Sequence, residues 1–583
     1  MAASALVDCG GGVRLERAVP CRMSDGVVLY ADHYYPPRSM QQTGPQPTLL
    51  MRQPYGRVIA STVVYAHPVW FACHGYNVVI QDVRGRGDSE GEFFPFRHEA
   101  RDGAETIASL RRRPESNGSV GMYGFSYQGM TQLLAAAEQP EGLLCIAPAM
   151  TAHDLYRGWF YHNGALRLAS ALGWGLQMLK ADARRLQLRD ASDALERAWA
   201  NLPAQYLETP YAAHPALHAE GLPSYVLDWL EHDTPGDYWA AMDVSMKLAN
   251  IRIPALHLSG WYDTYLTGSI DGFLALHSQA GSAEARAHQY LVAGPWVHIP
   301  WGDRIGPYSL GAAANLDTDM LHLRWFNHWL KGTNEFASEP RIRHFGLTFA
   351  HEGGRWHTAE DWPVEPTHVL YLHSQGRANS SKGNGTLTFA PPDTDEPPDI
   401  FVYDPEVPVT APGGLASPYG PSNQAAMELG NNVLIFTASA LAGPMHIFGS
   451  PLVELHCATS AASADLVAKL ICLRPNGDAI FIAIGIARSC ALFAEYAADT
   501  PHLWRFTLAP TSCVFSAGDR IRIEIASSAY PLYDRNPSTP VASRLANSWN
   551  WQRSTQTIYH DSMRPSSIRL HVVSPIEQST EAA

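Results

Sequence analysis

The chain has 583 residues, which is too long for one ordinary domain and predicts two or three hydrophobic cores. Hydrophobic residues make up 46% of it and aromatic residues 10%, a composition typical of a packed globular protein and not of a disordered one. The net charge of −14 argues against a nucleic-acid partner, and no apolar run of about 20 residues indicates a membrane span.

The first residues and the cysteines bear on location and cofactors. Residues 1–12 lack a charged stretch followed by an apolar one, so we expect no secretory signal peptide. The eight cysteines are scattered without a Cys-x-x-Cys pair, which indicates reduced thiols. His98 has no second histidine at the spacing of a zinc site. We therefore predict a cytoplasmic protein with no metal and no other cofactor.

Residues 1–150 alternate strand-like and helix-like segments. A helix is predicted over 130–138, and apolar runs predict strands at 48–52, 76–81 and 143–147. Such alternation is typical of a parallel sheet covered on both faces, so this is the first part of an α/β core.

Residues 151–245 have a different pattern. The stretch 166–200 is rich in Ala, Leu, Arg and Glu at helical spacing, which predicts a helical cap inserted into the core. Residues 246–345 then continue the core, with strands at 254–258 and 289–293 and a helix over 319–331 that ends at Gly332.

Residues 346–583 contain short strand-like runs separated by polar, Gly and Pro segments, without long helical patterns. The runs are 453–457, 466–472, 479–486, 504–508 and 521–525. They predict an all-β domain of the jelly-roll type.

The segment 119–130, SVGMYGFSYQGM, carries the strongest signal for chemistry. A short apolar strand enters a glycine-rich turn at Ser126, and a helix-forming run follows. An α/β-hydrolase exposes its nucleophile on such a turn, with the helix N-terminus beneath the developing oxyanion. Ser126 is therefore the candidate nucleophile, although a Gly-x-Ser-x-x-Gly string by itself is a weak signal.

A serine nucleophile needs a base and an acid, and in α/β-hydrolases these follow it in the order Asp or Glu, then His. A predicted strand in LHLSGWYD (256–263) ends in a loop with Asp263, and the next, in LVAGPWVH (291–298), ends in a loop with His298. Both loops should lie at the sheet edge where open α/β sheets bind ligands. Alone, Asp263 could be a turn residue and His298 an ordinary core histidine; the order and the three strand-end contexts favour catalysis.

The strings GFSYQG, GWYD and GPWVH resemble the active-site signatures of the cocaine esterase/X-prolyl dipeptidyl-peptidase family of serine hydrolases. Further matching strings are RQPYGR (52–57), MSDGVVLYADHYYP (23–36), QDVRGRGDSEGEF (81–93) and SSAYPLYDRN (527–536). The resemblance spans about residues 13–573 and implies an α/β-hydrolase core, a helical cap and a C-terminal jelly roll. It also implies an oxyanion hole made by the Tyr55 hydroxyl and the Tyr127 N–H.

The family contains esterases, X-Pro peptidases, α-amino-acid ester hydrolases and acylases. The amino-acid ester hydrolases carry carboxylates two and three residues after the acid, where this chain has Tyr265 and Leu266, so an α-amino group is not required. By loose alignment, Phe160, Trp174 and Tyr265 are candidates to hold an aromatic acyl group, with ordinary cap packing as the alternative.

We expect a carboxylic-ester hydrolase with a hydrophobic or aromatic acyl pocket. The alternatives are an amidase, acylase or X-Pro dipeptidyl-peptidase on the same residues, or a binding protein with an inactive core. The expected partner is a small ester or amide, without nucleic acid or membrane, and a homodimer is compatible with the sequence.

Overall fold

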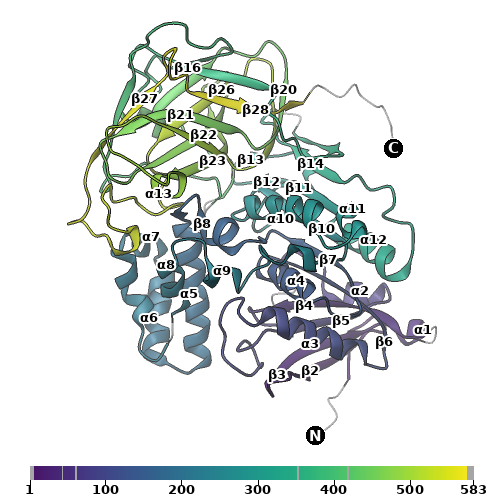
Figure 1. The fold of residues 1–583 in the computed structure, drawn as a ribbon. Coiled ribbons are helices and arrows are strands. Elements are labelled where there is room, and N and C mark those ends of the chain that lie inside the picture. The colour runs from purple at the N-terminus through teal and green to yellow at the C-terminus, as the bar shows by residue number, and fades with distance from the viewer. Residues whose placement is uncertain are drawn as a thin grey trace.

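The computed structural model describes residues 6–41, 44–58, 62–222, 224–350, 353–415 and 419–573. Residues 1–5 and 574–583, the outer ends of the first and last predicted segments, lie outside this description. Three regions are visible in Figure 1: a sheet with flanking helices, a group of helices beside it, and a β domain above both.

The first region is an eleven-stranded sheet with the order β1-β2-β3-β5-β4-β6-β7-β10-β11-β14-β15. The strands from β5 to β14 run parallel, whereas the three N-terminal strands and β15 are antiparallel to their neighbours. Their bounds are β1 Val7–Asp8, β2 Arg14–Arg22, β3 Val28–Tyr35, β4 Gln46–Gln53, β5 Asn77–Asp82, β6 Ser116–Phe125, β7 Leu143–Ala149, β10 Ala255–Tyr262, β11 Gln289–Val297, β14 Ile342–Gly346 and β15 Arg355–Ala359. The predicted α/β core is confirmed, and its sheet continues beyond residue 345 into β15.

Helices cover both faces of this sheet. Adjacent residues of β4 point to opposite faces: Leu50 belongs to a hydrophobic cluster that includes residues of α3 and α4, and Leu49 to another that includes residues of α2 and α12. The helices of this domain are α1 Arg38–Gln41, α2 Pro68–Cys73, α3 Glu99–Arg111, α4 Tyr127–Ala137, α10 Leu266–Gln279, α11 Ala283–Ala287 and α12 Thr318–Lys331. Two covered faces explain why β5 and β10 are buried along their whole length.

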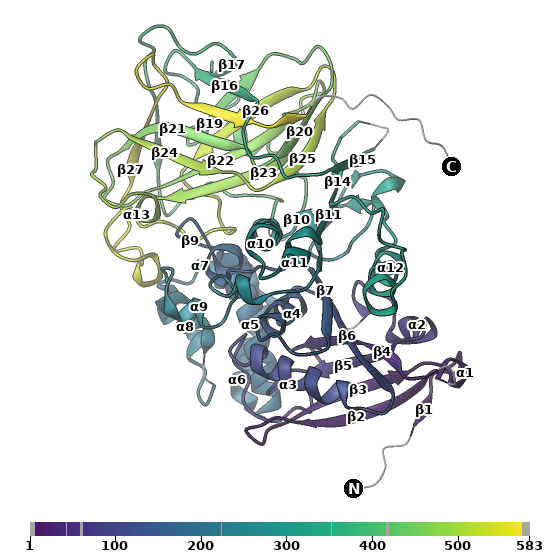
Figure 2. The same ribbon diagram turned by 45° about the vertical axis from the view of Figure 1, so that its right-hand side comes forward.

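The helical region is an insertion between β7 and β10, which are neighbours in the sheet. Its helices are α5 Leu168–Arg185, α6 Arg189–Ala200, α7 Leu202–Leu207, α8 Tyr225–Glu231 and α9 Asp237–Ala240. The predicted helical stretch 166–200 corresponds to α5 and α6. The chain leaves the sheet at the carboxyl end of β7 and returns at the amino end of β10, which runs parallel to β7, and the helices lie beside the sheet (Figure 2).

The C-terminal domain is built mainly of strands, and among the paired strands of its described residues β17 and β19 alone run parallel. Ten strands form the sheet path β18-β27-β21-β28-β16-β17-β19-β26-β22-β23, β24 joins at β21, and β25-β20-β29 form a smaller sheet. Their bounds are β16 His368–His373, β17 Thr386–Thr388, β18 Asp399–Tyr403, β19 Leu434–Ala438, β20 Met445–Gly449, β21 Leu452–Thr459, β22 Asp465–Leu473, β23 Ala479–Arg488, β24 His502–Thr507, β25 Thr511–Phe515, β26 Arg520–Ala526, β27 Ser554–Tyr559, β28 Ser567–Leu570 and β29 Val572–Val573. The predicted all-β domain is confirmed.

The C-terminal domain is fastened to the helical region by a buried ion cluster. The guanidinium of Arg488 contacts the carboxylates of Asp465 and Asp534, and Asp534 also accepts the backbone N–H of Leu166 at 2.9 Å. Tyr262, at the end of β10, donates to the carbonyl of Phe481 over 3.3 Å. The β domain is thereby held close to the ends of the core strands.

All eight cysteines are free thiols. Among the described helices, none is long and apolar enough to cross a bilayer.

Candidate active site

Ser126 lies on a strained turn between β6 and α4. Its φ of 62° and ψ of −127° are rare for a residue with a side chain, and its backbone N–H is held by the carbonyl of Ala149 at 2.9 Å. A side chain at Ser126 therefore leaves the strand sharply and faces the carboxyl edge of the sheet.

Gly129 makes this turn possible, because α4 approaches β7 closely there. A Cβ at position 129 would lie 2.8 Å from the Cβ of Thr151 and 3.0 Å from the carbonyl oxygen of Ala149. The glycine of this motif is therefore at position 129, one residue after Gln128. A side chain at position 129 would collide with the chain that follows β7.

Asp263 and His298 meet at the ends of two neighbouring strands. Asp263 directly follows β10 and His298 directly follows β11, and Nδ1 of His298 lies 2.5 Å from Oδ2 of Asp263. The carboxylate is fully buried, and its other oxygen accepts the backbone N–H of Tyr265 at 2.7 Å. A carboxylate held in this way fixes the imidazole with Nε2 available as a base.

Tyr55 lies beyond β4, beside Ser126. Its hydroxyl accepts the indole N–H of Trp174 at 3.2 Å. Burial raises the pKa of Tyr55 to about 12, so the phenol keeps its proton at neutral pH. Its backbone N–H is held by the Gln53 side chain at 2.8 Å.

The loop of Tyr55 is anchored by the arginine two residues later. Arg57 forms ion pairs with Asp32 at 2.8 Å, Asp82 at 2.5 Å and Asp88 at 2.6 Å. Two of these carboxylates, Asp82 and Asp88, belong to the string QDVRGRGDSEGEF (81–93). This segment supports the loop that places Tyr55.

Tyr127 combines a free backbone donor with a fixed side chain. As the first residue of α4, it has a backbone N–H without an intrahelical acceptor, at the positive end of the helix. Its hydroxyl donates to Glu99 at 2.8 Å and accepts the N–H of Phe96 at 3.0 Å. Glu99 in turn pairs with buried Arg52 at 2.8 Å. Burial, followed by the charge of Glu99, raises the pKa of Tyr127.

Ser126, His298 and Tyr55 face one cavity of about 560 Å³, formed by the core, the cap and the C-terminal domain. Its lining consists of Tyr55, Val63, Phe125, Ser126, Gln128, Ala169, Ser170, Gly173, Trp174, Gln177, Trp199, Leu202, Tyr206, Thr264, Tyr265, His298, Ile299 and Tyr419. The cavity can therefore hold a small acyl substrate against Ser126 and His298.

The structure separates the three residues predicted to hold an acyl group. Trp174 and Tyr265 line the cavity, whereas Phe160 is not among the lining residues. Phe160 is fully buried in the cap, with its ring 4.3 Å from that of Trp229 and 5.2 Å from that of Trp239. Its expected role is therefore corrected: Phe160 packs behind the cavity, in the arrangement that was the alternative.

Several lining residues had no signal in the sequence. Gln177, Trp199, Leu202 and Tyr206 come from the cap, and Tyr419 comes from the C-terminal domain. Helical spacing could have identified the buried face of α5, but not which residues turn toward Ser126. Nothing in the sequence connects position 419 with the site, because that contact depends on the docking of two domains.

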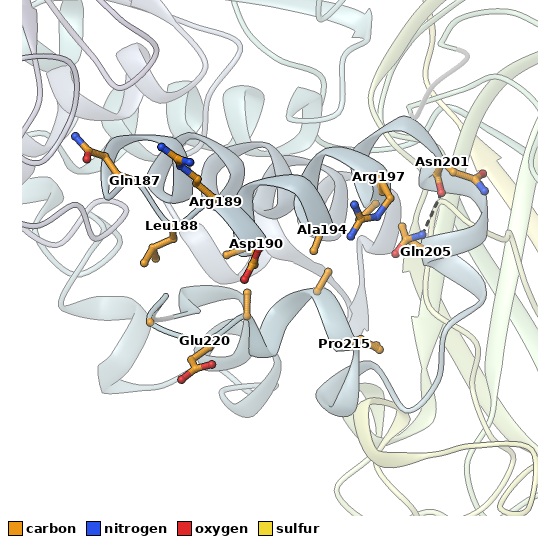
Figure 3. A pocket seen from close by; sticks show the side chains of 15 residues that line it. Gln187, Leu188, Arg189, Asp190, Ala194, Arg197, Asn201, Gln205, Pro215 and Glu220 are labelled. Atoms are coloured by element: carbon orange, nitrogen blue, oxygen red, sulfur yellow. Dashed lines mark hydrogen bonds between the residues drawn. The ribbon is translucent and has the colours of Figure 1, made fainter.

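A larger hollow lies elsewhere on the cap. It has a volume of about 950 Å³ and lies between α6 and the segment 215–221, with Arg189 and Asp190 on one wall and Pro215 and Glu220 on the other (Figure 3). None of the candidate catalytic side chains lines it. Ser126 and His298 line the smaller cavity instead.

Comparisons with known proteins cover nearly the whole chain. Residues 25–300 match the family model described as X-Pro dipeptidyl-peptidase (S15 family), and residues 334–569 match the X-Pro dipeptidyl-peptidase C-terminal non-catalytic domain. The cocaine esterase of Rhodococcus sp. (strain MB1 Bresler) is 33% identical over 560 residues, which cover 92% of this chain and 94% of that protein.

Two solved structures share the fold. An aminopeptidase from the marine sediment archaeon Thaumarchaeota archaeon superposes with a TM-score of 0.77 at 23% identity, covering 95% of each chain. An α-amino acid ester hydrolase gives a TM-score of 0.75 at 22% identity, covering 98% of each chain. Given the match to cocaine esterase along almost its entire length, this chain belongs to the cocaine esterase/X-Pro dipeptidyl-peptidase (S15) family of serine hydrolases.

Proposed function

We propose that this protein hydrolyses uncharged carboxylic esters through an acyl-enzyme on Ser126. The observation that carries the proposal is the chemistry of the cavity: among its described lining residues there is no Asp, Glu, Lys or Arg. The polar groups of its lining side chains are hydroxyls, amides, indole N–H groups and the His298 imidazole. A cavity of this kind favours a neutral substrate, because a buried charge without a partner is costly.

The proposed mechanism uses the contacts around Ser126. His298 removes the Ser126 proton as the hydroxyl attacks the acyl carbon, while Asp263 orients the imidazole and stabilises its cationic form. The Tyr55 hydroxyl and the Tyr127 N–H bind the oxyanion. His298 then protonates the leaving alcohol, and a water molecule, activated by His298, releases the acid from Ser126.

Aromatic rings support an aromatic or bulky hydrophobic acyl group. Trp174 and Tyr265 both line the cavity, and the ring of Trp174 is braced by a parallel stack on Trp229, with centroids 5.4 Å apart. Tyr265 stacks on Trp159 at 4.0 Å and meets the imidazole of His298 edge-on at 5.3 Å. Rigid rings beside the nucleophile would stack on a planar acyl group.

Peptidase or acylase activity is the alternative on the same residues. A peptidase that recognises a free N-terminus needs a carboxylate for the ammonium, and the described lining residues provide none. Residue 265 is tyrosine, and Leu266 is a buried residue of α10. These features favour the ester over an X-Pro dipeptide.

Matched substrates test this choice. Purified protein should hydrolyse p-nitrophenyl benzoate and p-nitrophenyl butyrate with a kcat/KM at least about 100-fold above that for an X-Pro p-nitroanilide, and Ser126→Ala should abolish both activities. Faster turnover of the X-Pro anilide than of every ester would overturn the esterase proposal. A fluorophosphonate probe that leaves Ser126 unlabelled would instead favour a binding protein with an inactive core.

We also propose a cytoplasmic location and a homodimeric assembly. Eight free cysteines support a reducing compartment such as the cytoplasm. A homodimer stays a proposal that sedimentation of the purified chain can test.

A further inference from the structure

We infer that Trp174 is a positioning residue for the oxyanion hole: its indole N–H occupies a lone pair of the Tyr55 oxygen, so that the phenol's only proton faces Ser126. The inference rests on the proposed serine-hydrolase chemistry. It gives Trp174 a role beyond that of an aromatic wall for the acyl group.

The direction of this hydrogen bond follows from the chemistry of the two groups. Nε1 of Trp174 lies 3.2 Å from the hydroxyl oxygen of Tyr55. An indole nitrogen can only donate, whereas a phenol can donate once and accept twice. Tyr55 must therefore be the acceptor, and its own O–H is free for another partner. Ser126 lines the same cavity as Tyr55, which makes its side chain the partner toward which this O–H turns.

Packing fixes the orientation of the Trp174 indole, so that its N–H stays directed at Tyr55. Trp174 stacks on Trp229 with an interplanar angle of 4°, and further rings surround it. The ring centroids of Trp159, Phe96 and Tyr127 lie 5.8, 5.9 and 6.2 Å from that of Trp174. An indole enclosed in this way has little freedom to turn its N–H away from Tyr55.

The same contact links the cap to catalysis. Trp174 belongs to α5 of the cap, whereas Tyr55 follows β4 of the core. A phenol that accepts a hydrogen bond becomes a better donor, because the two bonds polarise each other in a water-poor site. The cap would thus contribute to the stability of the transition state as well as to the shape of the pocket.

A double-mutant cycle tests the inference. The variants are Tyr55→Phe, Trp174→Phe and the double variant, together with replacement of Trp174 by benzothienylalanine, which keeps the ring shape and removes only the N–H. With p-nitrophenyl benzoate, removal of this N–H should lower kcat about 10-fold and change KM less than about two-fold. In the Tyr55→Phe background the same replacement should change kcat less than about two-fold, because no phenol is left to orient.

Three outcomes would overturn the inference. Equal losses of kcat in both backgrounds would assign Trp174 to the pocket wall alone, and so would a change confined to KM. An unchanged kcat in Tyr55→Phe would remove the phenol from the oxyanion hole. Thermal unfolding of each variant identifies any global loss of structure, and the benzothienylalanine variant keeps the test open if Trp174→Phe does not fold.

Failure of the esterase proposal gives a different result. If the wild type hydrolyses no ester, the cycle is run on the rate constant for fluorophosphonate labelling of Ser126, because phosphonylation also places an oxygen in the oxyanion hole. A labelling rate that falls about 10-fold without the Trp174 N–H, only when Tyr55 is present, supports the inference independently of the substrate. Losses that are equal in both backgrounds contradict it.

Discussion

The hydroxyl of Tyr127 donates a hydrogen bond to the carboxylate of Glu99 over 2.8 Å. Glu99 is the first residue of α3, and Tyr127 is the first residue of α4. The side chain of the residue after the candidate nucleophile Ser126 is therefore hydrogen-bonded to a neighbouring helix, while its backbone N–H, at the start of α4, has no intrahelical acceptor and is the proposed oxyanion donor. The strained turn at Ser126 is held in place by this contact.

Loss of the Tyr127 hydroxyl should lower both stability and kcat. In Tyr127→Phe the Glu99 oxygen and the Phe96 N–H lose their partner, which should cost about 1–3 kcal/mol of the free energy of unfolding. We expect kcat to fall roughly 10-fold with KM little changed, because the first turn of α4, and with it the Tyr127 N–H, is held less precisely. Urea unfolding and ester kinetics measure the two effects.

The matched control is Tyr123→Phe, which lies three residues before Ser126 on β6. Tyr123 is also fully buried, but its hydroxyl has no hydrogen-bond partner among the described residues. Removing it should leave stability and kcat nearly unchanged. Similar losses in both variants would show that any buried tyrosine in this region is equally sensitive.

Replacement of Asp263 should remove catalysis and leave binding intact. In Asp263→Asn an amide can face Nδ1 of His298 and stabilise the wrong tautomer, so kcat should fall by roughly 10³–10⁴-fold while KM changes little. Steady-state kinetics and the rate of fluorophosphonate labelling check this. Asp395→Asn, at an exposed position of the C-terminal domain, should behave as the wild type. A loss below about 10-fold at Asp263 would mean that another group orients the imidazole.

An added methyl group at Gly129 should displace α4. In Gly129→Ala the new Cβ would lie 2.8 Å from Thr151, so the helix must shift at a cost of about 1–3 kcal/mol, with a fall in kcat. Gly443→Ala is the control, since a Cβ at position 443 would meet nothing within 4 Å. Thermal unfolding and kcat distinguish the two variants. Wild-type values for Gly129→Ala would mean that the turn tolerates movement.

Acid should destabilise the contact between the core sheet and the C-terminal domain. His344 of β14, His357 of β15 and His446 of β20 meet there, with the rings of His357 and His446 4.4 Å apart. Burial lowers the pKa of His344 to about 2, of His357 to about 4 and of His446 to about 3. Neighbouring histidines contribute at His344 and His446, and Arg355 contributes at His357 and His446.

The direction of the pH effect follows from these values. Each folded-state pKa lies below the ordinary histidine value of 6.5, so the folded protein binds fewer protons than the unfolded chain between pH 6.5 and about 4. Stability present above pH 6.5 is lost as the pH falls through this window. For His344, which is buried, the loss approaches about 1.4 kcal/mol per pH unit, and partly exposed His357 contributes less.

Thermal unfolding between pH 7.5 and 5 measures this effect. The unfolding temperature of the wild type should fall with acid, and His446→Gln should show a shallower fall because one half-buried imidazole of lowered pKa is gone. His218→Gln removes an exposed histidine and should retain the wild-type slope. Equal slopes in all three proteins would assign the acid sensitivity to other groups.

The sequence predicts the candidate triad in the order Ser, Asp, His, because each of these residues is identified by the apolar strand that directly precedes it. Ser126, Asp263 and His298 each follow an apolar run directly, and parallel strands bring such positions to one edge whatever the rest of the fold does. Tyr55, by contrast, was implied only by the resemblance of RQPYGR to the family's string. The confirmed fold classes follow from the same short-range signals, namely alternating elements first and strands alone later.

Only the tertiary structure decided which side chains surround the substrate cavity. Phe160 and Trp174 are both aromatic residues of the cap, yet Trp174 faces Tyr55 and Phe160 packs against Trp229. Tyr419 reaches the cavity because the C-terminal domain docks beside the core strands. The physical reason is the distance along the chain over which each feature is determined. A strand end or a glycine turn depends on residues close in sequence, whereas the wall of a cavity depends on how separate domains pack.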